Sequence, residues 1–530
     1  MTTAPALTTD QMIHLRLDEL RTVMPASQWR RLAAIDARLV DPRQPYYHIL
    51  QHILQYTGEE IPFNCYLMSR KIHQCPQADA RWQDHHLKLH RLKQELATMT
   101  DSRIIDTDYD VEAGRARSII HVEWGPALAR ILYHGNTPQM LKEGLIDVVT
   151  GQPISPRRAR ARWMAVRDTI NAANAAHVQQ PSVQALLTYL NNGLQRRDFT
   201  FAPAAVEAAW ALIHARYAQS QRPAAEVVES KAEKAARLHL YRSAASARNV
   251  LNQVLLWPQP LYAQKGHTPR LSAMGLSLCS LPSDVRRVLA PDWLELDLAS
   301  CHLAVLARLG SATKLLAFLE ARNAGTGPGW WDYLAGVMGV TAVRGSAAFA
   351  TFKEAMKRVT YAACYGMAAK RLFLPQRKDN GALAEPLSMV AALATITEDQ
   401  QQAFRADPLV QELLGAVDAL RLRIDVARGM PDAWGQMVLL GQDDDDEEGC
   451  DSKSVLSQVC QSYELRLLEG VAEAAQEELR KTRPRWRLVL WQHDGISIAV
   501  DQDQRARILA LLQDRVAATA AVMGFPTRLE

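Results

Sequence analysis

The sequence predicts a helix-rich α+β protein, and three observations support this prediction. Most long windows of the 530-residue chain combine alanine, leucine, arginine and glutamate, residues with high helix propensity. The stretch LELDLASCHLAVLARL (294–309) begins with the period of a strand and continues with that of a helix. The run RWRLVLWQHDGISIAV (485–500) indicates two strands joined at a His-Asp-Gly bend.

The composition is that of a globular protein. The chain is 48% hydrophobic and 22% charged, as folded domains are. Lys plus Arg number 61 and Asp plus Glu 57, a net charge of +4, so any interaction with nucleic acid has to come from local basic clusters. The seven cysteines include no CxxC pair, which predicts free thiols in a reducing compartment and no structural zinc site.

The sequence shows no sign of secretion or of membrane insertion. The start MTTAPALTTDQM lacks the basic residues and the apolar run of a signal peptide. No apolar run approaches the roughly 20 residues that span a bilayer. We therefore expect a cytoplasmic protein without a membrane partner, and its oligomeric state stays open.

The first 260 residues are expected to form an N-terminal accessory domain (1–150) and a helical, thumb-like region (151–260). In the former, SIIHVEW (118–124) predicts a strand. We interpret IIDTDYDVE (104–112) as an acidic surface loop rather than part of a proofreading exonuclease. The helical region carries the basic segment SPRRARARWMAVR (155–167), which either contacts phosphates or is a solvated surface.

The remaining chain is expected to form three further parts. Residues 261–310 contain the strand-to-helix unit. Helices dominate again over 311–450, which ends in the acidic run GQDDDDEEGC (441–450), expected to be a solvated loop. The last part, 451–530, holds a helix, the two strand-like runs and a final helix.

One predicted helix, FKEAMKRVTYAACYGM (352–367), has the side chains to bind a nucleoside triphosphate. Side chains four residues apart drift by only about 40° per step on a helix, so they form one stripe about 18 Å long. Its two ammonium groups suit phosphates, and its two rings suit a base and sugar. Gly366 follows, where the missing side chain allows a close approach. The alternative is an amphipathic helix with half-buried tyrosines. The stripe consists of Lys353, Lys357, Tyr361 and Tyr365.

Two aspartates stand at positions typical of a metal site. Asp297 ends the predicted strand, and Asp494 lies at the bend between the two later strands. Two-metal phosphoryl transfer requires carboxylates that hold two Mg²⁺ ions about 4 Å apart. Mg²⁺ takes few protein carboxylates, because water and substrate phosphates complete its shell. Together with the helix between them in the sequence, the pair therefore predicts a two-metal phosphoryl-transfer site, although an Asp at a bend alone is ordinary turn chemistry.

These three stretches, in this order, resemble the polymerase motifs of the family A DNA polymerases, the bacterial polymerase I type. They resemble less closely the single-subunit phage and mitochondrial RNA polymerases. The unit with Asp297 resembles motif A, and His493-Asp494 resembles motif C. Motif B is matched by Lys353, Lys357, Tyr361, Tyr365 and Gly366.

Two weaker similarities fit the same order. The segment HTPRLSAMGLSLCSLPSDVRR (267–287) is similar to the Thr-x-Arg segment before motif A, which implies that Arg270 contacts the primer-template. The helix before the hairpin resembles the glutamine-bearing helix that follows the template. That helix carries Gln458, Gln461 and Glu464.

The resemblance implies a right-hand polymerase fold. Its palm, with an antiparallel sheet, would come from 261–310 and 451–530, its fingers from 311–450 and its thumb from 151–260. It further implies two Mg²⁺ ions as cofactors, and DNA primer-template and nucleoside triphosphates as partners.

The same resemblance implies the role of each residue. Asp297 and Asp494 would hold the metals, and Lys357 would neutralise the triphosphate and protonate the leaving pyrophosphate. The other expected nucleotide contacts are Lys353, Tyr361, Tyr365, Gly366 and His302. The other expected primer-template contacts are His493, Gln458 and Gln461.

The sequence departs from the family pattern at two positions. His302 stands where the DNA polymerases carry a glutamate beside the sugar 2′ position, and Gly495 follows Asp494 in place of Glu or Ser. We expect a compact DNA polymerase of a plasmid, phage or mobile element that lacks an exonuclease. The alternatives are a single-subunit RNA polymerase or primase on the same scaffold, and a catalytically inactive nucleic-acid-binding palm.

Overall fold

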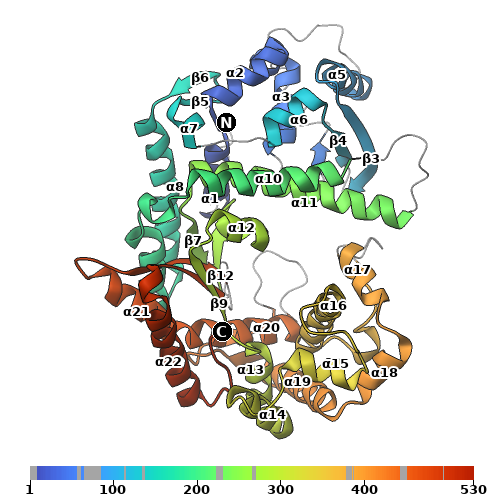
Figure 1. Ribbon diagram of the computed structural model, residues 1–530, viewed down its shortest axis with the longest axis vertical. Helices are drawn as coiled ribbons and strands as arrows, with labels where there is room; N and C mark the ends of the chain where they lie inside the picture. Colours follow the sequence, from blue (N-terminus) through green and yellow to red (C-terminus); the bar gives the residue numbers. More distant parts are fainter. Residues whose placement is uncertain are drawn as a thin grey trace, which may run out of the picture. The chain divides into compact units, whose positions relative to one another are not determined.

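The computed structural model describes residues 9–55, 61–64, 85–112, 115–133, 138–221, 231–264, 270–377, 385, 387–441, 451–492 and 495–530. The chain divides into two compact units (Figure 1). Unit 1 consists of Met1–Ala176, Leu194–Leu261 and Ala273–Pro291. Unit 2 consists of His177–Gly193, Tyr262–Ser272 and Asp292–Glu530. The helix-rich α+β prediction is confirmed, since the described sheets have only two or three strands among many helices.

Unit 1 is largely helical. Its described helices are α1 (Thr9–Arg21), α2 (Ala26–Ile35), α3 (Pro45–Gln55), α5 (His85–Met99), α6 (Pro126–Tyr133), α7 (Pro138–Lys142), α8 (Pro156–His177, whose last residue belongs to unit 2), α10 (Pro203–Gln219), α11 (Lys231–Leu256) and α12 (Ser283–Leu289). One sheet has the order β1 (Val23–Pro25), β5 (Leu145–Asp147), β6 (Gln152–Ile154). The other has the order β2 (Ile61–Asn64), β4 (Arg115–Glu123), β3 (Arg103–Glu112). The strand expected at 118–124 is therefore confirmed by β4, and the described residues between 155 and 260 are mostly helical, as expected.

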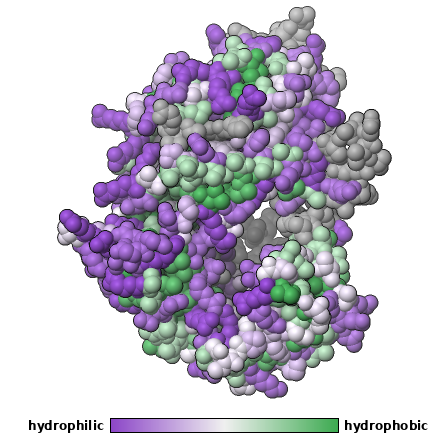
Figure 2. All heavy atoms as spheres, viewed as in Figure 1, coloured by the Kyte–Doolittle hydropathy of each residue, from purple (hydrophilic) through white to green (hydrophobic). Residues whose placement is uncertain are grey.

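Helix α10 shows how the core of unit 1 forms. One face of the helix buries Val206, Trp210, Ile213 and Tyr217, whose spacing of three and four residues places them on a single side. The Tyr217 ring stacks on that of Tyr133 from α6, with ring centroids 4.0 Å apart. The outward face is rich in alanine, and Figure 2 shows a pale to green apolar band over this helix.

The interpretation of 104–112 as a surface loop is wrong, because these residues lie in β3. The carboxylates alternate with Thr107, Tyr109 and Val111, which is the period of a strand. The run of acidic residues obscured that alternation. The register places Asp110 opposite Arg117 and Glu112 opposite Arg115, whereas Asp106 and Asp108 are opposite isoleucines.

The basic segment of α8 divides between two roles. Arg157, Arg158 and Arg160 are exposed. Arg162 instead forms an ion pair with Asp147 at the end of β5 and donates a hydrogen bond to Thr22 Oγ1. Arg162 therefore serves the packing of unit 1, and Arg167 pairs with Asp168, whereas the three exposed arginines remain candidates for phosphate contact.

Unit 2 surrounds a three-stranded sheet with helices. Its helices are α9 (Pro181–Thr188), α13 (Cys301–Leu309), α14 (Thr313–Asn323), α15 (Trp330–Val337), α16 (Ala347–Cys364), α17 (Leu387–Ala394), α18 (Glu398–Ala406), α19 (Pro408–Ala427), α20 (Ser452–Leu467), α21 (Glu469–Leu479) and α22 (Arg505–Met523). The sheet has the order β12 (Trp486–Gln492), β13 (Gly495–Val500), β9 (Trp293–Asp297). A further pair is β10 (Gly429–Pro431) with β11 (Met437–Leu439). The pair β7 (Leu261–Gln264) and β8 (Leu271–Met274) also lies partly in unit 2, while Leu261 and the last two residues of β8 belong to unit 1.

The central sheet confirms two local predictions. The run 485–500 forms the antiparallel pair β12–β13, and the stretch 294–309 forms β9 followed by α13. Two tyrosine hydroxyls bind the backbone of β12: Leu488 N–H donates to Tyr189 Oη over 3.1 Å, and Trp491 N–H donates to Tyr262 Oη over 3.0 Å. These two N–H groups of β12 therefore have hydrogen-bond partners other than β13.

Several other expectations can be compared with the described part of the chain. The cysteines there are free, as predicted, and they are Cys279, Cys301, Cys364 and Cys460. None of the helices there has both the length and the apolar character that crossing a bilayer requires. The acidic run 442–450 lies outside the described residues. The five domain boundaries expected from the sequence stay predictions.

Candidate functional site

The site is built around the last residue of β9. Asp297 is exposed, and Gly495, the first residue of β13, lies directly opposite it in the antiparallel register. A Cβ atom on Gly495 would lie 2.1 Å from Asp297 Oδ1, far inside van der Waals contact. The missing side chain therefore provides the space that the Asp297 carboxylate occupies. His493 and Asp494 lie outside the described residues, and Asp494 directly precedes Gly495 in the chain.

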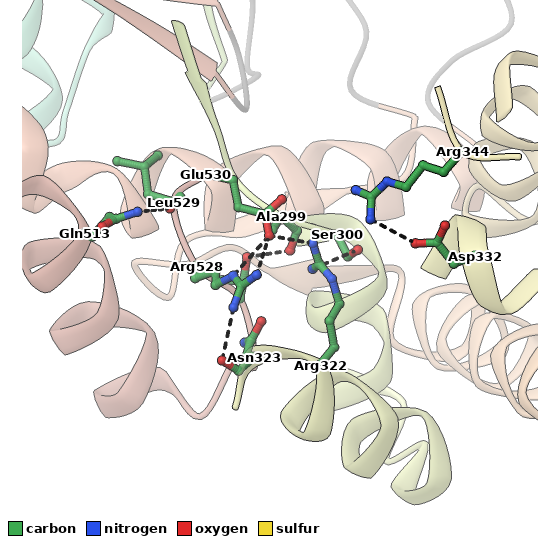
Figure 3. Close-up of polar contacts among 11 residues, drawn as sticks. Ala299, Ser300, Arg322, Asn323, Asp332, Arg344, Gln513, Arg528, Leu529 and Glu530 are labelled. Carbon is green, nitrogen blue, oxygen red and sulfur yellow. Dashed lines mark hydrogen bonds and ion pairs between the residues drawn. The ribbon is translucent and has the colours of Figure 1, made fainter. Parts of the chain in front are cut away.

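The other side of β9 is paired with the segment 527–530, which we call the tail strand (Figure 3). Asp297 N–H donates to Glu530 O and Glu530 N–H donates to Asp297 O, each over 2.9 Å. Ala299 N–H donates to Arg528 O over 2.8 Å. Leu298 and Leu529 form an antiparallel bridge. The backbone on both sides of Leu298 is thus fixed by the tail strand.

Side chains of the tail strand extend this attachment. Glu530 Oε1 accepts from Arg322 of α14 over 2.9 Å and from Arg528. Arg322 Nη1 donates to Ser300 Oγ over 3.3 Å. In Figure 3, Arg322 and Arg528 approach Glu530 from different elements. The segment that carries Asp297 into α13 is therefore held through side chains as well as through backbone bonds.

The tail strand was not predicted from the sequence, although its residues alternate between buried and exposed. Thr527 and Leu529 are buried, whereas Arg528 and Glu530 are exposed. This alternation is the period of a strand. Four residues are too few to distinguish that pattern from chance, and nothing in the sequence indicates that β9 is the partner.

We predict that Thr527→Val weakens this attachment. Thr527 is buried and its hydroxyl donates to Ala299 O over 2.8 Å. Valine has the same shape but no donor, so the free energy of unfolding should fall by about 1 kcal/mol. Chemical denaturation measures the change. The matched control is Thr188→Val, because the exposed Thr188 hydroxyl donates to Gln184 O within a helix and its loss should change little. Equal effects of the two substitutions would contradict the role of Thr527.

The turn after Asp297 directs α13. Ser300 has φ of 52°, in the left-handed region, and its carbonyl accepts from Ala304 N–H over 3.0 Å as the helix begins. This turn sends the chain from the end of β9 straight into a helix whose first seven residues are buried. His302 is the second of them, so the turn places its imidazole inside unit 2.

His302 lies where three elements meet. Its Nε2 is 2.9 Å from the Tyr365 hydroxyl, directly after α16, and 3.2 Å from Glu464 Oε1 of α20. The rings of Tyr361 and Tyr365 both meet the imidazole edge-on, with centroids 5.4 Å away. The structure therefore brings the expected sugar-side residue of α13 together with both tyrosines of the predicted stripe. The contact with Glu464 was not anticipated.

His302 is a neutral imidazole at neutral pH. Burial, with a smaller contribution from the charge of Arg270, lowers the pKa of His302 to about 4. The nearby Glu464 carboxyl favours the charged form, but His302 is only 8% exposed, so the loss of hydration dominates. Burial also raises the pKa of Tyr365, which keeps its hydroxyl protonated and available for the imidazole.

This pKa predicts a loss of stability in acid. The unfolded chain binds a proton at His302 near pH 6.5, whereas the folded chain does so only near pH 4. Between these values the unfolded state holds more protons, so stability falls as the pH falls through this window, by up to a few kcal/mol. In His302→Gln the difference in unfolding midpoint between pH 7 and pH 5 should be smaller than in the wild type. An equal difference would show that His302 does not carry the effect.

Helix α16 carries the first three residues of the predicted stripe, and Tyr365 lies directly after its last residue. Ser346 caps its start, accepting from Phe349 N–H over 3.2 Å. Lys353 and Lys357 are exposed, and Tyr361 is half-buried. The helix ends at Cys364, although Tyr365 N–H still donates to Tyr361 O over 3.0 Å. The tyrosines are thus partly buried, as the amphipathic alternative expects, while the lysines are open to solvent.

Gly366, two residues after the end of α16, turns the chain away from the helix. Its φ of 76° lies in the left-handed region, which glycine adopts at little cost. Its carbonyl accepts from Arg421 Nη1 of α19 over 3.1 Å, and a Cβ atom would lie 2.5 Å from Arg421 Cδ. The expected close approach at Gly366 is therefore made by a side chain of unit 2 itself.

Helix α20 was expected to contact the template through its glutamines, and the structure shows that it also contributes a glutamate to the surroundings of His302. Glu464 is buried and contacts His302. Gln458 is buried as well, and Gln461 is half-buried and donates to Ser457 Oγ over 3.1 Å. The expected template contacts of Gln458 and Gln461 stay predictions.

The donor set at the end of β9 fits a hard divalent cation. Asp297 offers an exposed carboxylate at the end of β9. Oxygen donors of this kind, few in number and open to water, suit Mg²⁺. Within the residues searched, no cluster of three or more His, Cys, Asp or Glu side chains could hold a metal ion, and Asp494 is not among the described residues.

Comparisons with known proteins gave matches among solved structures only. No family model and no curated protein sequence matches the chain. Among solved structures, the chain is similar to the POL domain of Pol1 from M. smegmatis in complex with DNA primer-template and dNTP. The identity is 12%, the match covers 76% of each chain, and the TM-score is 0.46.

Proposed function

We propose that the chain is a template-directed nucleotidyltransferase, a compact DNA polymerase whose reaction takes place at Asp297 and Asp494. The observation that supports this most directly is the register of the central sheet. Gly495, the chain neighbour of Asp494, lies opposite Asp297 and leaves space for its carboxylate. Asp494, 197 positions after Asp297 in the sequence, thus directly precedes the strand that pairs with β9.

Each residue of the proposed site would have its own role in the reaction. Asp297 and Asp494 would hold Mg²⁺, which when bound makes the primer 3′-hydroxyl more acidic and neutralises charge on the triphosphate. Lys357 and Lys353, exposed on α16, would bind the phosphates. Their ammonium groups act as point charges and lack the bidentate geometry of arginine. Tyr361 would pack against the incoming nucleotide.

Further assignments belong to the same proposal. Tyr365 would occupy the templating position until the fingers close, and His493 and Arg270 would contact the primer-template. Residues 261–310 and 451–530 would form the palm, 311–450 the fingers and 151–260 the thumb. We propose no exonuclease for the accessory region, and an origin in a plasmid, phage or mobile element.

His302 is the residue on which sugar selection would depend. A neutral imidazole bound to Tyr365 and Glu464 replaces the glutamate that the related DNA polymerases carry beside the 2′ position. We predict that His302→Glu sharpens discrimination against ribonucleotides by about tenfold, since pocket contacts of this size contribute 1–3 kcal/mol. The ratio of kcat/KM for dNTP and NTP measures it. An unchanged ratio would remove His302 from the sugar pocket.

A primer-extension assay tests the function and separates the alternatives. Labelled primer-template is incubated with the full chain and Mg²⁺, with dNTPs or NTPs offered separately, and then template is offered without primer. Extension with dNTPs alone supports the DNA polymerase. Use of NTPs or unprimed synthesis would favour the RNA polymerase or primase. Binding without any synthesis would indicate an inactive palm module.

A further inference from the structure

Unit 1 contains a cavity that the proposed polymerase chemistry does not use. It has a volume of about 60 Å³ and is bordered by residues of α1, α2, α3, α6 and α11. Its lining contains two arginines and no carboxylate. The polar residues that matter below are Arg21, Gln51, Arg248 and Asn252.

Arg248 is a buried cation to which the described part of the chain supplies no ion-pair partner. It is 3% exposed, and its Nε and Nη2 both donate to Asn249 Oδ1, over 3.0 and 2.8 Å. Its Nη1 has no hydrogen-bond partner in the part of the chain that the structure describes. The guanidinium lies 5.3 Å from the Tyr133 ring centroid. A buried charge that is not paired is costly, so the fold leaves this one in need of an anion.

Three tyrosines and two aspartates of unit 1 are acidic groups that do not supply that anion. Burial raises the pKa of Tyr133, Tyr217 and Tyr241, so these hydroxyls stay uncharged at neutral pH. The Arg21 guanidinium is paired with Asp18, whose side chain is 65% exposed. Asp147, which precedes the cavity-lining Val148, is paired with Arg162. These nearby carboxylates are therefore already engaged by other arginines.

Two amide side chains that border the same cavity also need partners. Gln51 is 6% exposed, and neither its Nε2 nor its Oε1 has a hydrogen-bond partner among the described residues. The same holds for Asn252 Oδ1. Buried polar groups are nearly always hydrogen-bonded. The cavity thus combines unmet donors on Arg248 and Gln51 with unmet acceptors on Gln51 and Asn252.

We propose that this cavity binds a small protonated oxyanion of the phosphate class. The negative charge would neutralise Arg248, and the anion oxygens would accept from Arg248 Nη1 and Gln51 Nε2. The two P–OH groups of dihydrogen phosphate, H₂PO₄⁻, would donate to Gln51 Oε1 and Asn252 Oδ1. Fully ionised sulfate has the same shape and charge class but no proton to donate, so it binds more weakly.

Titration calorimetry and thermal unfolding of the full chain test this site, with inorganic phosphate and sulfate as probes. The buffer is at pH 7 and constant ionic strength, without nucleic acid, nucleotide or Mg²⁺, so the result is independent of the polymerase proposal. Phosphate should release heat and raise the unfolding midpoint. Arg248→Met and Gln51→Leu, which keep the side-chain volume, should each bind phosphate at least about tenfold more weakly, the loss of one charge-assisted bond.

Arg16→Met is the matched control, because it removes an arginine of α1 that does not line the cavity; it should bind as the wild type does. In phosphate-free buffer Arg248→Met should unfold at a higher temperature than the wild type, since it removes an unpaired buried charge. The proposal is overturned if phosphate causes neither heat nor a midpoint shift in the wild type, or if both cavity variants bind as well as Arg16→Met. Sulfate that binds as tightly as phosphate would exclude the role of the amide oxygens.

Discussion

Asp297→Asn is expected to lower the rate of nucleotide incorporation by roughly 10³-fold, the scale seen when a preorganised electrostatic group at a reaction centre is removed. The amide has the same size as the carboxylate, so β9, its pairing with Gly495 and the tail strand should remain. It is uncharged, however, and a poor ligand for a hard cation. Affinity for primer-template should change by less than about threefold, because the lost interaction concerns metal positioning and transition-state stabilisation.

Single-turnover extension and binding to the same labelled duplex measure the two effects separately. Asp292→Asn is the matched control, since Asp292 is also exposed and lies just before β9, at the opposite end from Asp297. It should incorporate nucleotides at the wild-type rate. If Asp297→Asn kept more than a tenth of the wild-type rate, the reaction centre would have to be placed elsewhere.

Gly495→Ala is expected to have the second largest effect, a loss of about 10²-fold in incorporation. The added Cβ atom would lie 2.1 Å from Asp297 Oδ1, so either the carboxylate rotates away or the two strands separate. A displacement of about 1 Å at a reaction centre costs on this order. Gly495 does not have a positive φ, so alanine introduces no backbone strain, and the effect comes from the contact alone.

Gly336→Ala provides the control for a glycine substitution as such. Gly336 lies in α15, and nothing stands within 4 Å of its added Cβ atom. Activity should be unchanged. A double-mutant cycle identifies the mechanism: if Gly495→Ala acts by moving the carboxylate, it should cost little once Asp297 is already asparagine. Independent, multiplicative losses would show that Gly495 acts through another group.

Sequence reasoning succeeded where the signal is local. The alternation before Asp297, the helical spacing of Lys353 and Lys357, and the two strand-like runs within 485–500 predict local elements, and the structure contains β9, α16 and the pair β12–β13. Each pattern repeats over a few residues of one element, so it depends on backbone period rather than on distant partners.

The features of the site that could not be predicted from the sequence depend on contacts between segments that are far apart in the chain. No local pattern indicates that Glu464 meets His302, because this contact joins residues 162 positions apart through the packing of α13 on α20. The pairing of Asp297 with Glu530 is equally non-local. The space beside Gly495 could not be foreseen either, since a glycine after a bend is ordinary turn chemistry until its neighbour across the sheet is known.

The tail strand has a consequence for how copies of this protein behave in concentrated solution. In the order β12-β13-β9, the strand that carries Asp297 is the outermost, and its exposed amide and carbonyl groups would otherwise be open to any extended peptide. An uncovered outermost strand is a template for intermolecular pairing. If these four residues were to detach, self-association would therefore begin at the strand that carries Asp297.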